Sequence, residues 1–298
     1  MPELPEVEAL ARFLRERTAG RAVDRIEVGA ISALKTFRPT PDDLAGGTVA
    51  GVARHGKWLD LTVDVDAPGG GPLHLVWHLA RAGWVRWSDA LSPTPVRPGK
   101  SPLALRVRLD DGSGFDITEA GTRKKVAVHA VHDPAQVERI ATLGVEPLSD
   151  DFTVERLTEL MAARNQQVKG LLRDQGTIAG IGNAYSDEIL HAARTSPFAL
   201  TRSFDAEHVT TLYRAIRDVL TEAVLTASGR PAAELKDAKR RGMRVHGRAG
   251  EPCPGWNGIP CGDTVHEVSF ADSSLQYCPT CQTGGKPLAD RRLSRLLK

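Results

Sequence analysis

The first residues of the chain carry its clearest potential for covalent chemistry. Removal of Met1 would make Pro2 a free secondary amine with the carboxyl group of Glu3 beside it. Such an amine can attack an electrophilic sugar carbon and form an iminium ion. An α-amino group has a pKa of roughly 7.7–8.0 in model peptides, so burial or a nearby cation would leave it neutral. A neighbouring carboxyl group can then donate and accept the protons that follow.

The same residues also have an ordinary explanation, which is a chain terminus followed by a helix. Pro5 and Glu6 suit the first turn of a helix. Apolar residues recur at helical spacing from Val7 onwards, and Gly20 supplies a stop. This explanation accounts for the helix but not for the residues that precede it.

Lys57 follows Gly56 between two strand-like runs of sequence. Taken alone, such a lysine is an exposed turn residue. A compact ammonium at this place could also neutralise a phosphate group and help to keep a nearby amine uncharged.

A glycine-rich turn, residues 178–183, precedes a helical pattern that begins at Ala184. Glycines permit a tight turn, and the first backbone N–H groups of a helix can receive a phosphate. Asn183 can add a side-chain donor. A Gly-x-Gly pair by itself is more often a plain helix start.

All four cysteines lie in the last 50 residues. Cys278 and Cys281 enclose two residues, a spacing typical of a tetrahedral zinc site, whereas Cys253 and Cys261 enclose seven. Two disulfides are the alternative, but thiols stay reduced in the cytoplasm, which favours a metal. If the expanded first pair fails to bind, His266 is the substitute ligand that the sequence offers.

Composition predicts a soluble, two-domain globular protein of 298 residues, with 41% hydrophobic and 26% charged residues. There is no apolar run of membrane-spanning length and no signal-peptide pattern, so a cytoplasmic, nucleoid-associated protein is expected. Net charge is only +2. Basic residues nevertheless cluster at 230–248 and 286–298, as expected for a polyanion partner or for solvated surface.

The pattern of short strands up to about residue 145 indicates an antiparallel sandwich or barrel. Strands are expected at 23–28, 48–65 with a break at 54–57, 73–79, 103–109, 115–118 and 126–131. Helices are expected at 152–163, 166–174, 184–193 and 206–227. We expect four parts: a sandwich at 1–145, a helical domain at 146–240, a cysteine module at 241–285 and a basic tail at 286–298.

Taken together, these motifs resemble the formamidopyrimidine-DNA glycosylase / endonuclease VIII family. The residues that carry the resemblance are the N-terminal Pro2–Glu8 segment, the Lys57 turn, the 178–190 glycine turn and the cysteine module, in family order. The resemblance implies an α+β fold: an antiparallel β-sandwich with an N-terminal helix, then a helix–two-turn–helix domain carrying a C-terminal β-hairpin zinc finger.

The resemblance also implies the roles of individual residues. Pro2 would be the nucleophile, Glu3 the general acid/base, and Glu6 a support of the N-terminus and lesion pocket. Lys57 would contact phosphate beside the lesion, and the cysteines would hold structural zinc. The implied DNA contacts come from Lys169, Asn183, Arg123 and Arg81.

Several positions depart from the family pattern. Arg81 stands where the family has a gap-filling methionine, and Lys124 replaces the phenylalanine that follows the arginine matched by Arg123. Ser273 stands where the zinc-finger hairpin has an arginine, a role that Lys286, Arg291 or Arg292 could take over. Arg81 and Lys124 lie where the family fills the gap left by a flipped nucleotide, whereas the family's arginine at the position of Ser273 grips phosphates around the lesion. Neither the excised base nor its opposite base therefore follows from the sequence.

The function expected is a monomeric DNA glycosylase with AP-lyase activity on damaged double-stranded DNA, with zinc as the only cofactor and no membrane partner. A damage- or structure-specific DNA-binding protein without catalysis is one alternative. A zinc-finger regulator of transcription is the other, and it would prefer one undamaged sequence.

Overall fold

The computed structural model describes residues 1–66, 71–99, 101–120, 124–255, 259–270 and 273–289. The chain forms two compact units. Unit 1 comprises Met1–Leu143 and Ala227–Lys236, and unit 2 comprises Gly144–Thr226 and Asp237–Lys298. None of the helices in the described ranges is long and apolar enough to cross a membrane.

Unit 1 contains two four-stranded antiparallel sheets, in the orders β1-β6-β7-β5 and β2-β3-β4-β8. The strands are β1 (Val23–Val28), β2 (Thr48–His55), β3 (Trp58–Asp64), β4 (Leu73–His78), β5 (Gly83–Ser88), β6 (Leu103–Leu109), β7 (Gly114–Glu119) and β8 (Ala127–Val131). Apolar residues of both sheets form one core, in which Trp77 of β4 stacks on Phe115 of β7 with ring centroids 5.7 Å apart.

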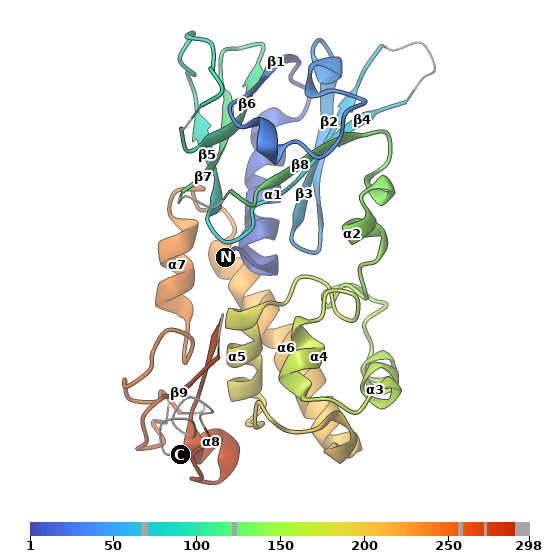
Figure 1. Cartoon of the computed structure of the whole chain (residues 1–298). Helices are drawn as coiled ribbons and strands as arrows, with labels where there is room; N and C mark the ends of the chain where they lie inside the picture. The colour runs from blue at the N-terminus through green and yellow to red at the C-terminus, as the bar shows by residue number, and fades with distance from the viewer. Residues whose placement is uncertain (67–70, 100, 121–123, 256–258, 271–272, 290–298) are drawn as a thin grey trace, which may run out of the picture. The chain divides into compact units, whose positions relative to one another are not determined.

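Helix α1 (Leu4–Thr18) packs against the sandwich and is drawn in dark blue in Figure 1. Val7, Leu10 and Leu14 recur at helical spacing, and all three side chains are fully buried in the core of unit 1. The helix therefore begins only three residues after the chain does, and its burial fixes where the N-terminus lies. The short α2 (Glu138–Ala141) ends the first part of unit 1.

Strand register brings three connections to one end of the sandwich. Trp58 at the start of β3 pairs with His78 at the end of β4, and His78 pairs with Ala127 at the start of β8. In the other sheet, Gly83 of β5 pairs with Glu119 of β7. The 56–57 turn, the 79–82 loop and the described residues that flank the β7–β8 connection, 120 and 124–126, consequently share this end, which we call the loop end.

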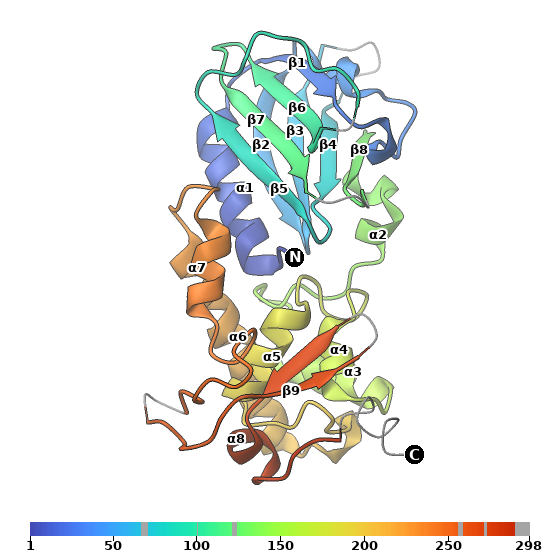
Figure 2. The same ribbon diagram turned by 60° about the vertical axis from the view of Figure 1, so that its left-hand side comes forward.

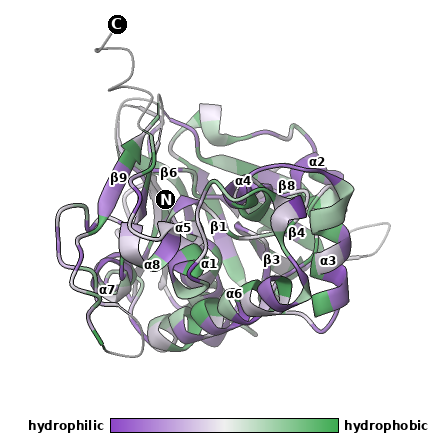
Figure 3. Ribbon diagram, turned by 90° about the horizontal axis from the view of Figure 1, so that it is seen from below, coloured by the Kyte–Doolittle hydropathy of each residue, from purple (hydrophilic) through white to green (hydrophobic). Residues whose placement is uncertain are grey.

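Unit 2 is helical up to its C-terminal part. Its helices are α3 (Val154–Ala163), α4 (Val168–Arg173), α5 (Asn183–Ala192) and α6 (Ala206–Ala227), and α7 (Leu235–Gly242) spans the second boundary with unit 1. Hydrophobic and hydrophilic residues alternate along α6, as Figure 3 shows. This amphipathic pattern buries Leu212, Ile216 and Leu220 on one face of the helix.

The C-terminal part of unit 2 is a hairpin of β9 (His266–Ser269) and β10 (Ser274–Tyr277), followed by α8 (Pro279–Thr283). The hairpin lies beside α5 (Figure 2). The side-chain amide of Asn183, the first residue of α5, donates to the carbonyl oxygen of Ser274 at 2.7 Å. The glycine turn and the hairpin are thereby tied together.

The structure confirms the predicted α+β class, including the sandwich, the helical region and the cysteine-bearing hairpin. Strand β5 and the helices α2, α7 and α8 were missed. Strand β5 was overlooked because Trp84 and Trp87 do not alternate strictly with polar residues, and α7 because five of its eight residues are charged. The return of 227–236 to unit 1 was not foreseen either, since it rests on tertiary packing of Ala232 and Leu235.

Candidate functional site

The residues at the N-terminus are buried although they begin the chain. Pro2 is buried, Glu3 and Glu6 are each 2% exposed, and Met1 is 50% exposed. The backbone N–H of Glu3 donates to Oε2 of Glu6 at 2.9 Å, one half of a capping box at the start of α1. Glu6 therefore fixes the backbone on which Glu3 and Pro2 are carried.

Arg54 connects α1 to the Lys57 turn. Its Nε donates to Oε2 of Glu8 in α1 at 3.0 Å, and its Nη1 donates to the carbonyl oxygen of Gly56 at 2.9 Å. Gly56 has φ 55 in the two-residue connection between β2 and β3, a conformation that glycine adopts without strain. Lys57, the next residue, is 8% exposed. Arg54 thus positions the predicted lysine relative to the N-terminal helix.

His78 lies beside Lys57 at the loop end. Its ring packs on Trp58 with centroids 4.9 Å apart. Burial lowers the pKa of His78 to about 4, and the positive charges of Lys57 and Arg139 contribute to that fall. Nδ1 of the neutral ring accepts the backbone N–H of Ala80 at 3.1 Å, so the proton of the imidazole resides on Nε2.

The loop that begins at His78 carries Arg81, which is exposed. Ala80 has φ 50, a left-handed conformation that costs roughly 1–2 kcal/mol for residues with a Cβ atom. The hydrogen bond to His78 holds this strained residue in place. His78 therefore determines the backbone path to Arg81.

The low pKa of His78 predicts that unit 1 becomes less stable in mild acid. The unfolded chain takes up a proton near pH 6.5 and the folded chain only near pH 4, so stability is lost as the pH falls between these values. That difference corresponds to a loss on the order of 3 kcal/mol. Chemical denaturation at pH 7.5 and 5 should show a smaller loss in His78→Asn than in the parent. His132→Asn, at an exposed position, is the matched control, and equal pH dependence of all three proteins would contradict the assignment.

The connection between β7 and β8 is anchored by a buried carboxylate. Glu119 is 2% exposed and accepts the backbone N–H groups of Lys125 at 2.8 Å and Val126 at 3.0 Å. Nζ of Lys124 donates to the carbonyl oxygen of Glu119. Arg123, predicted to contact DNA, lies outside the described residues, but both sides of its loop are held at the loop end.

In unit 2, the side chain of Gln175 braces the glycine turn. Its Oε1 accepts the N–H of Gly180 at 3.0 Å, and its Nε2 donates to the carbonyl oxygen of Ile181 at 2.7 Å. Gly180 has φ 87, and Gly182 is the N-cap of α5 and brings no side-chain cap. The start of α5 has the shape of an anion site, with the dipole of the helix behind it.

Lys169, predicted to contact phosphate, is 6% exposed and is held by acceptors within unit 2. Its Nζ donates to the carbonyl oxygen of Asn183 at 3.3 Å, to Oγ of Ser186 at 2.9 Å and to Oδ1 of Asp187. An ammonium group has three N–H donors, and these acceptors match all three. Lys169 therefore braces the first turn of α5 from beneath.

The next residue of α5, Glu188, binds the segment that leads to the cysteines. Its carboxylate accepts three consecutive backbone N–H groups, from Arg244 at 2.7 Å, Val245 at 2.9 Å and His246 at 2.8 Å. Burial raises the pKa of Glu188, and the three N–H groups oppose that rise. Helix α5 therefore follows the glycine turn at its N-terminal end, and Glu188 on its side binds the segment that leads to the cysteine module.

The four cysteines come together although the first pair is expanded. One ligand atom from each lies within 4.8 Å of all the others. The Sγ atoms of Cys253 and Cys281 are 3.9 Å apart, and those of Cys261 and Cys278 are 3.5 Å apart. Tetrahedral zinc with Zn–S bonds of about 2.3 Å requires S···S distances of about 3.8 Å. The donor set fits zinc, and none of the four thiols forms a disulfide in the structure, which favours the metal over the two-disulfide alternative.

A histidine that sequence reasoning missed borders this cluster. Nε2 of His191, on α5, lies 3.3 Å from Sγ of Cys253, and its ring is 2% exposed. The substitute ligand suggested by the sequence, His266, packs on the ring of Tyr277 instead. Burial also raises the pKa of Cys281 to about 12, and four crowded thiols become thiolates most readily around a cation. Only the fold could reveal His191, because it lies 62 residues before Cys253 in the sequence.

The hairpin tip contains no guanidinium group among its described residues. The carbonyl oxygen of Ser273 accepts the N–H of Phe270 at 2.7 Å and closes the turn. Lys286 is exposed after α8, whereas Arg291 and Arg292 lie outside the described residues. Of the three residues proposed to replace the missing tip arginine, Lys286 is therefore the one whose position the structure describes.

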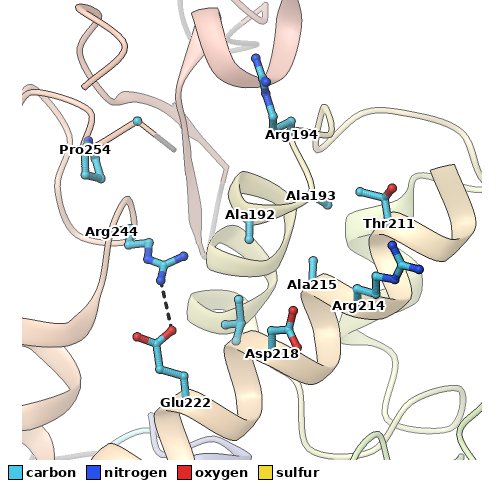
Figure 4. Close-up of a pocket in the computed structure, with 12 residues that line it drawn as sticks. Ala192, Ala193, Arg194, Thr211, Arg214, Ala215, Asp218, Glu222, Arg244 and Pro254 are labelled. Atoms are coloured by element: carbon cyan, nitrogen blue, oxygen red, sulfur yellow. Dashed lines mark hydrogen bonds and ion pairs between the residues drawn. The ribbon is translucent and has the colours of Figure 1, made fainter. Parts of the chain in front are cut away.

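A groove at the other end of α5 has a volume of about 750 Å³. Figure 4 shows the residues that line it, among them Ala192, Ala193, Arg194 and residues on one face of α6. On its rim, Nη2 of Arg244 lies 3.1 Å from Oε2 of Glu222. Asn183 and Ala192 are nine residues apart, so α5 separates this groove from the glycine turn by about 14 Å. The groove is consequently distinct from the glycine turn at the start of α5.

Two family models match the chain. The formamidopyrimidine-DNA glycosylase N-terminal domain matches residues 1–128, and the formamidopyrimidine-DNA glycosylase H2TH domain matches residues 143–232. The formamidopyrimidine-DNA glycosylase of Roseiflexus sp. is 36% identical over 293 residues, which is 95% of this chain and 100% of the relative. An uncharacterized formamidopyrimidine-DNA glycosylase-like protein of Mycobacterium tuberculosis is 55% identical over 148 residues, which is 50% of this chain and 90% of that protein.

Solved structures agree with these matches. The MutM (Fpg) protein of Thermus thermophilus has 30% sequence identity and a TM-score of 0.76, covering 96% of this chain and 100% of that one. The Lactococcus lactis Fpg (MutM) in complex with DNA containing N7-benzyl-Fapy-dG has 25% identity and a TM-score of 0.80, covering 95% and 100%.

Proposed function

The chain belongs to the formamidopyrimidine-DNA glycosylase family, and we propose that it excises damaged bases from double-stranded DNA and cleaves the resulting abasic site. The observation that carries this proposal is the N-terminal arrangement. Pro2 and Glu3 are buried at the start of α1, Glu6 fixes their backbone, and Arg54 links the same helix to the Lys57 turn.

The reaction begins once Met1 has been removed. The lone pair of the Pro2 nitrogen forms a bond to C1′ of the flipped nucleotide, and the bond from C1′ to the base breaks with its electron pair remaining on the base. The N–H proton of Pro2 is transferred to the departing base, which leaves neutral. Glu3 donates a proton to the ring oxygen of the sugar, which opens the ring and leaves a cationic iminium. The iminium acidifies the C2′ proton, and its removal expels the 3′ phosphate by β-elimination. A second elimination expels the 5′ phosphate.

A cation beside the N-terminus would keep the nucleophile available. Lys57 is buried, and its charge would oppose protonation of the Pro2 amine and pair with a phosphate beside the lesion. Glu6 acts through the backbone of Glu3 rather than on the substrate. Arg81, at the loop end, would contact the DNA, and Arg123 would supply a second DNA contact.

Unit 2 would bind the DNA backbone. The backbone N–H groups at the start of α5 would receive a phosphate. Lys169 positions this first turn of the helix by donating to the carbonyl oxygen of Asn183. Zinc held by the four cysteines would fix the hairpin tied to Asn183. Because such contacts neutralise phosphates, affinity should fall steeply as salt rises.

Borohydride reduction in the presence of abasic-site duplex tests the proposal. Protein confirmed by intact mass to lack Met1 should form a covalent DNA adduct, since borohydride reduces the iminium to a stable amine. If processed, folded protein forms no adduct, the chain would instead be a damage-binding protein without catalysis. That alternative is suggested by Arg81, at the position where the family has a gap-filling methionine, and by Ser273, where the family has an arginine that grips phosphate.

The proposed role of Glu3 makes a quantitative prediction. Glu3→Gln removes the proton donor, so excision of a damaged base should slow by roughly 10²- to 10⁴-fold, the usual contribution of general acid–base catalysis. Single-turnover kinetics on a lesion-containing duplex measure this loss. Glu16→Gln is the matched control, because the Glu16 side chain is on the same helix and 70% exposed. Equal rates for the two variants would remove Glu3 from the mechanism.

A further inference from the structure

Unit 1 has a second pocket, of about 630 Å³, on the side of the sandwich where β5 forms the edge of its sheet. Residues of α1, β5 and the returning 231–236 segment line it. They are Phe13, Arg17, Trp84, Val85, Arg86, Trp87, Asp89, Pro231, Ala232, Ala233 and Lys236. Phe13 lies ten residues along α1 from Glu3, about 15 Å, so this pocket is separate from the reaction site.

The aromatic wall of the pocket is rigidly built. Nε1 of Trp84 donates to the carbonyl oxygen of Ala232 at 2.9 Å, which fixes the returning segment against β5. Nε1 of Trp87 donates to Oδ1 of Asp89 at 2.7 Å, and its ring meets the edge of Phe13 with centroids 6.2 Å apart. Trp84 is 7% exposed, but Trp87 is only partly buried. Trp87 therefore offers ring surface to a ligand.

Three cations share this pocket. The guanidinium carbon of Arg17 lies 3.9 Å from the centroid of Phe13, and Nζ of Lys236 lies 4.6 Å from the centroid of Trp84. Burial, followed by the charge of Arg86, lowers the pKa of Lys236. A like-charged neighbour and partial burial both disfavour the ammonium, and a bound anion would relieve that cost.

Strand pairing explains why Arg86 is available. Its cross-strand neighbour on β7 is Asp116, but Asp116 also pairs with Arg106 of β6. Arg106 occupies both carboxylate oxygens, with Nε at 2.7 Å and Nη2 at 2.9 Å. Within the described part of the chain, neither Arg86 nor Lys236 forms an ion pair. Arg17 lies 3.9 Å from Glu16, and the Asp89 carboxylate in the pocket accepts the indole N–H of Trp87. The pocket consequently presents the charges of Arg86 and Lys236, which no carboxylate among the described residues pairs with.

We propose that this pocket binds one nucleotide, with its base on Trp87 and its phosphate groups against Arg86, Lys236 and Arg17. A tryptophan face binds any base, and arginine and lysine bind phosphate oxygens. The volume lies within the range of pockets that hold small ligands. A free nucleotide and a nucleotide of a single strand offer the same chemistry. This proposal does not depend on catalysis at Pro2.

Titration calorimetry with ADP, and fluorescence anisotropy with a labelled ten-residue oligothymidylate, test the two sources. At least one probe should bind the full-length protein, and the probe that binds identifies the source. Failure of both to bind would overturn the proposal. Arg86→Glu and Lys236→Glu should each weaken binding by on the order of tenfold, whereas Lys35→Glu, at a position elsewhere on unit 1, should not. If all three variants weaken binding equally, the nucleotide is attracted by the overall charge of the protein rather than by this pocket, and the proposal is overturned.

The contribution of the base is tested separately. Trp87→Ala should weaken ADP binding by roughly 5- to 150-fold, the range expected from stacking on an aromatic ring, and leave pyrophosphate binding unchanged. Trp87→Phe, which keeps a ring against Phe13, should restore most ADP affinity and shows that the fold tolerates the change. Equal ADP affinity in Trp87→Ala and the parent would contradict the stacked geometry. Borohydride trapping should be unaffected in Arg86→Glu, which separates this site from the reaction site.

Discussion

A variant in which Pro2 is replaced by glycine should excise bases and cleave abasic sites on the order of 10²-fold more slowly, equivalent to about 2.7 kcal/mol of activation free energy. A secondary amine gives an iminium that stays cationic, because its nitrogen has no proton to lose. The primary amine of glycine gives an imine that must be protonated before it can acidify C2′. Glycine also removes the ring that restrains the backbone immediately before Glu3, the N-cap of α1.

The measurement is single-turnover cleavage of abasic duplex by protein whose intact mass shows removal of Met1. Pro5→Ala is the matched control, because Pro5 lies in the first turn of α1 but cannot become the terminal amine. The control should retain near-parental rates. If trimmed, folded Pro2→Gly matches the parent as well, the terminal nitrogen is not the nucleophile.

The second large effect is expected at the cysteine module. Cys278→Ser should lower the zinc content from one ion per chain to near zero, because the remaining thiols cannot complete a tetrahedral Cys₄ site. Structural zinc supplies roughly 10–16 kcal/mol of apparent binding free energy in small fingers, so the hairpin should lose its fold. DNA affinity should then fall by at least about tenfold, since β10 is tied to Asn183.

The histidines near the module provide controls for this prediction. His266→Ala should retain zinc, because its ring packs on Tyr277 rather than on the sulfur atoms. Metal analysis and fluorescence anisotropy with abasic duplex measure both quantities. If the Cys278→Ser protein still binds one zinc ion, another side chain must replace the lost thiol as a ligand. The His191 imidazole, which lies beside Cys253, would then be the candidate.

The features that the sequence revealed are those encoded by near neighbours. The Pro2–Glu3 pair, the Gly56–Lys57 turn and the Cys278–Cys281 spacing each lie within a few residues, and local geometry fixes what such segments can do. Strand alternation also predicted most of the sandwich, because one face of each strand must be buried. Even the expanded Cys253–Cys261 pair was assigned correctly to the cluster, since sequence spacing to Cys278 was preserved.

The residues that the sequence did not reveal act across long separations. Arg54 bridges α1 and β2, Glu188 binds a segment more than 50 residues away, and His191 reaches Cys253. Each was an unremarkable charged or polar residue within its own element. Lys169 shows the same limit, since only the fold reveals Asp187 and Ser186 beneath its ammonium group. Such partners depend on packing, which no local pattern encodes.

The identity of the damaged base depends on the loops whose residues differ from the family pattern. Arg81 follows a strained Ala80, and Lys124 bonds back to the carbonyl oxygen of Glu119. We expect a cationic rather than an apolar contact with the gap left by a flipped nucleotide. Rates on a panel of oxidised purines, oxidised pyrimidines and abasic sites would assign the preferred lesion.

The most direct test of the account is to locate the trapped bond. Protein lacking Met1 is reduced with borohydride on abasic-site DNA, digested, and analysed by mass spectrometry. We predict that the deoxyribose remnant is attached to the nitrogen of Pro2 in the N-terminal peptide. Attachment to a lysine instead, Lys57 included, or an N-terminal peptide that remains unmodified, would contradict the proposed chemistry.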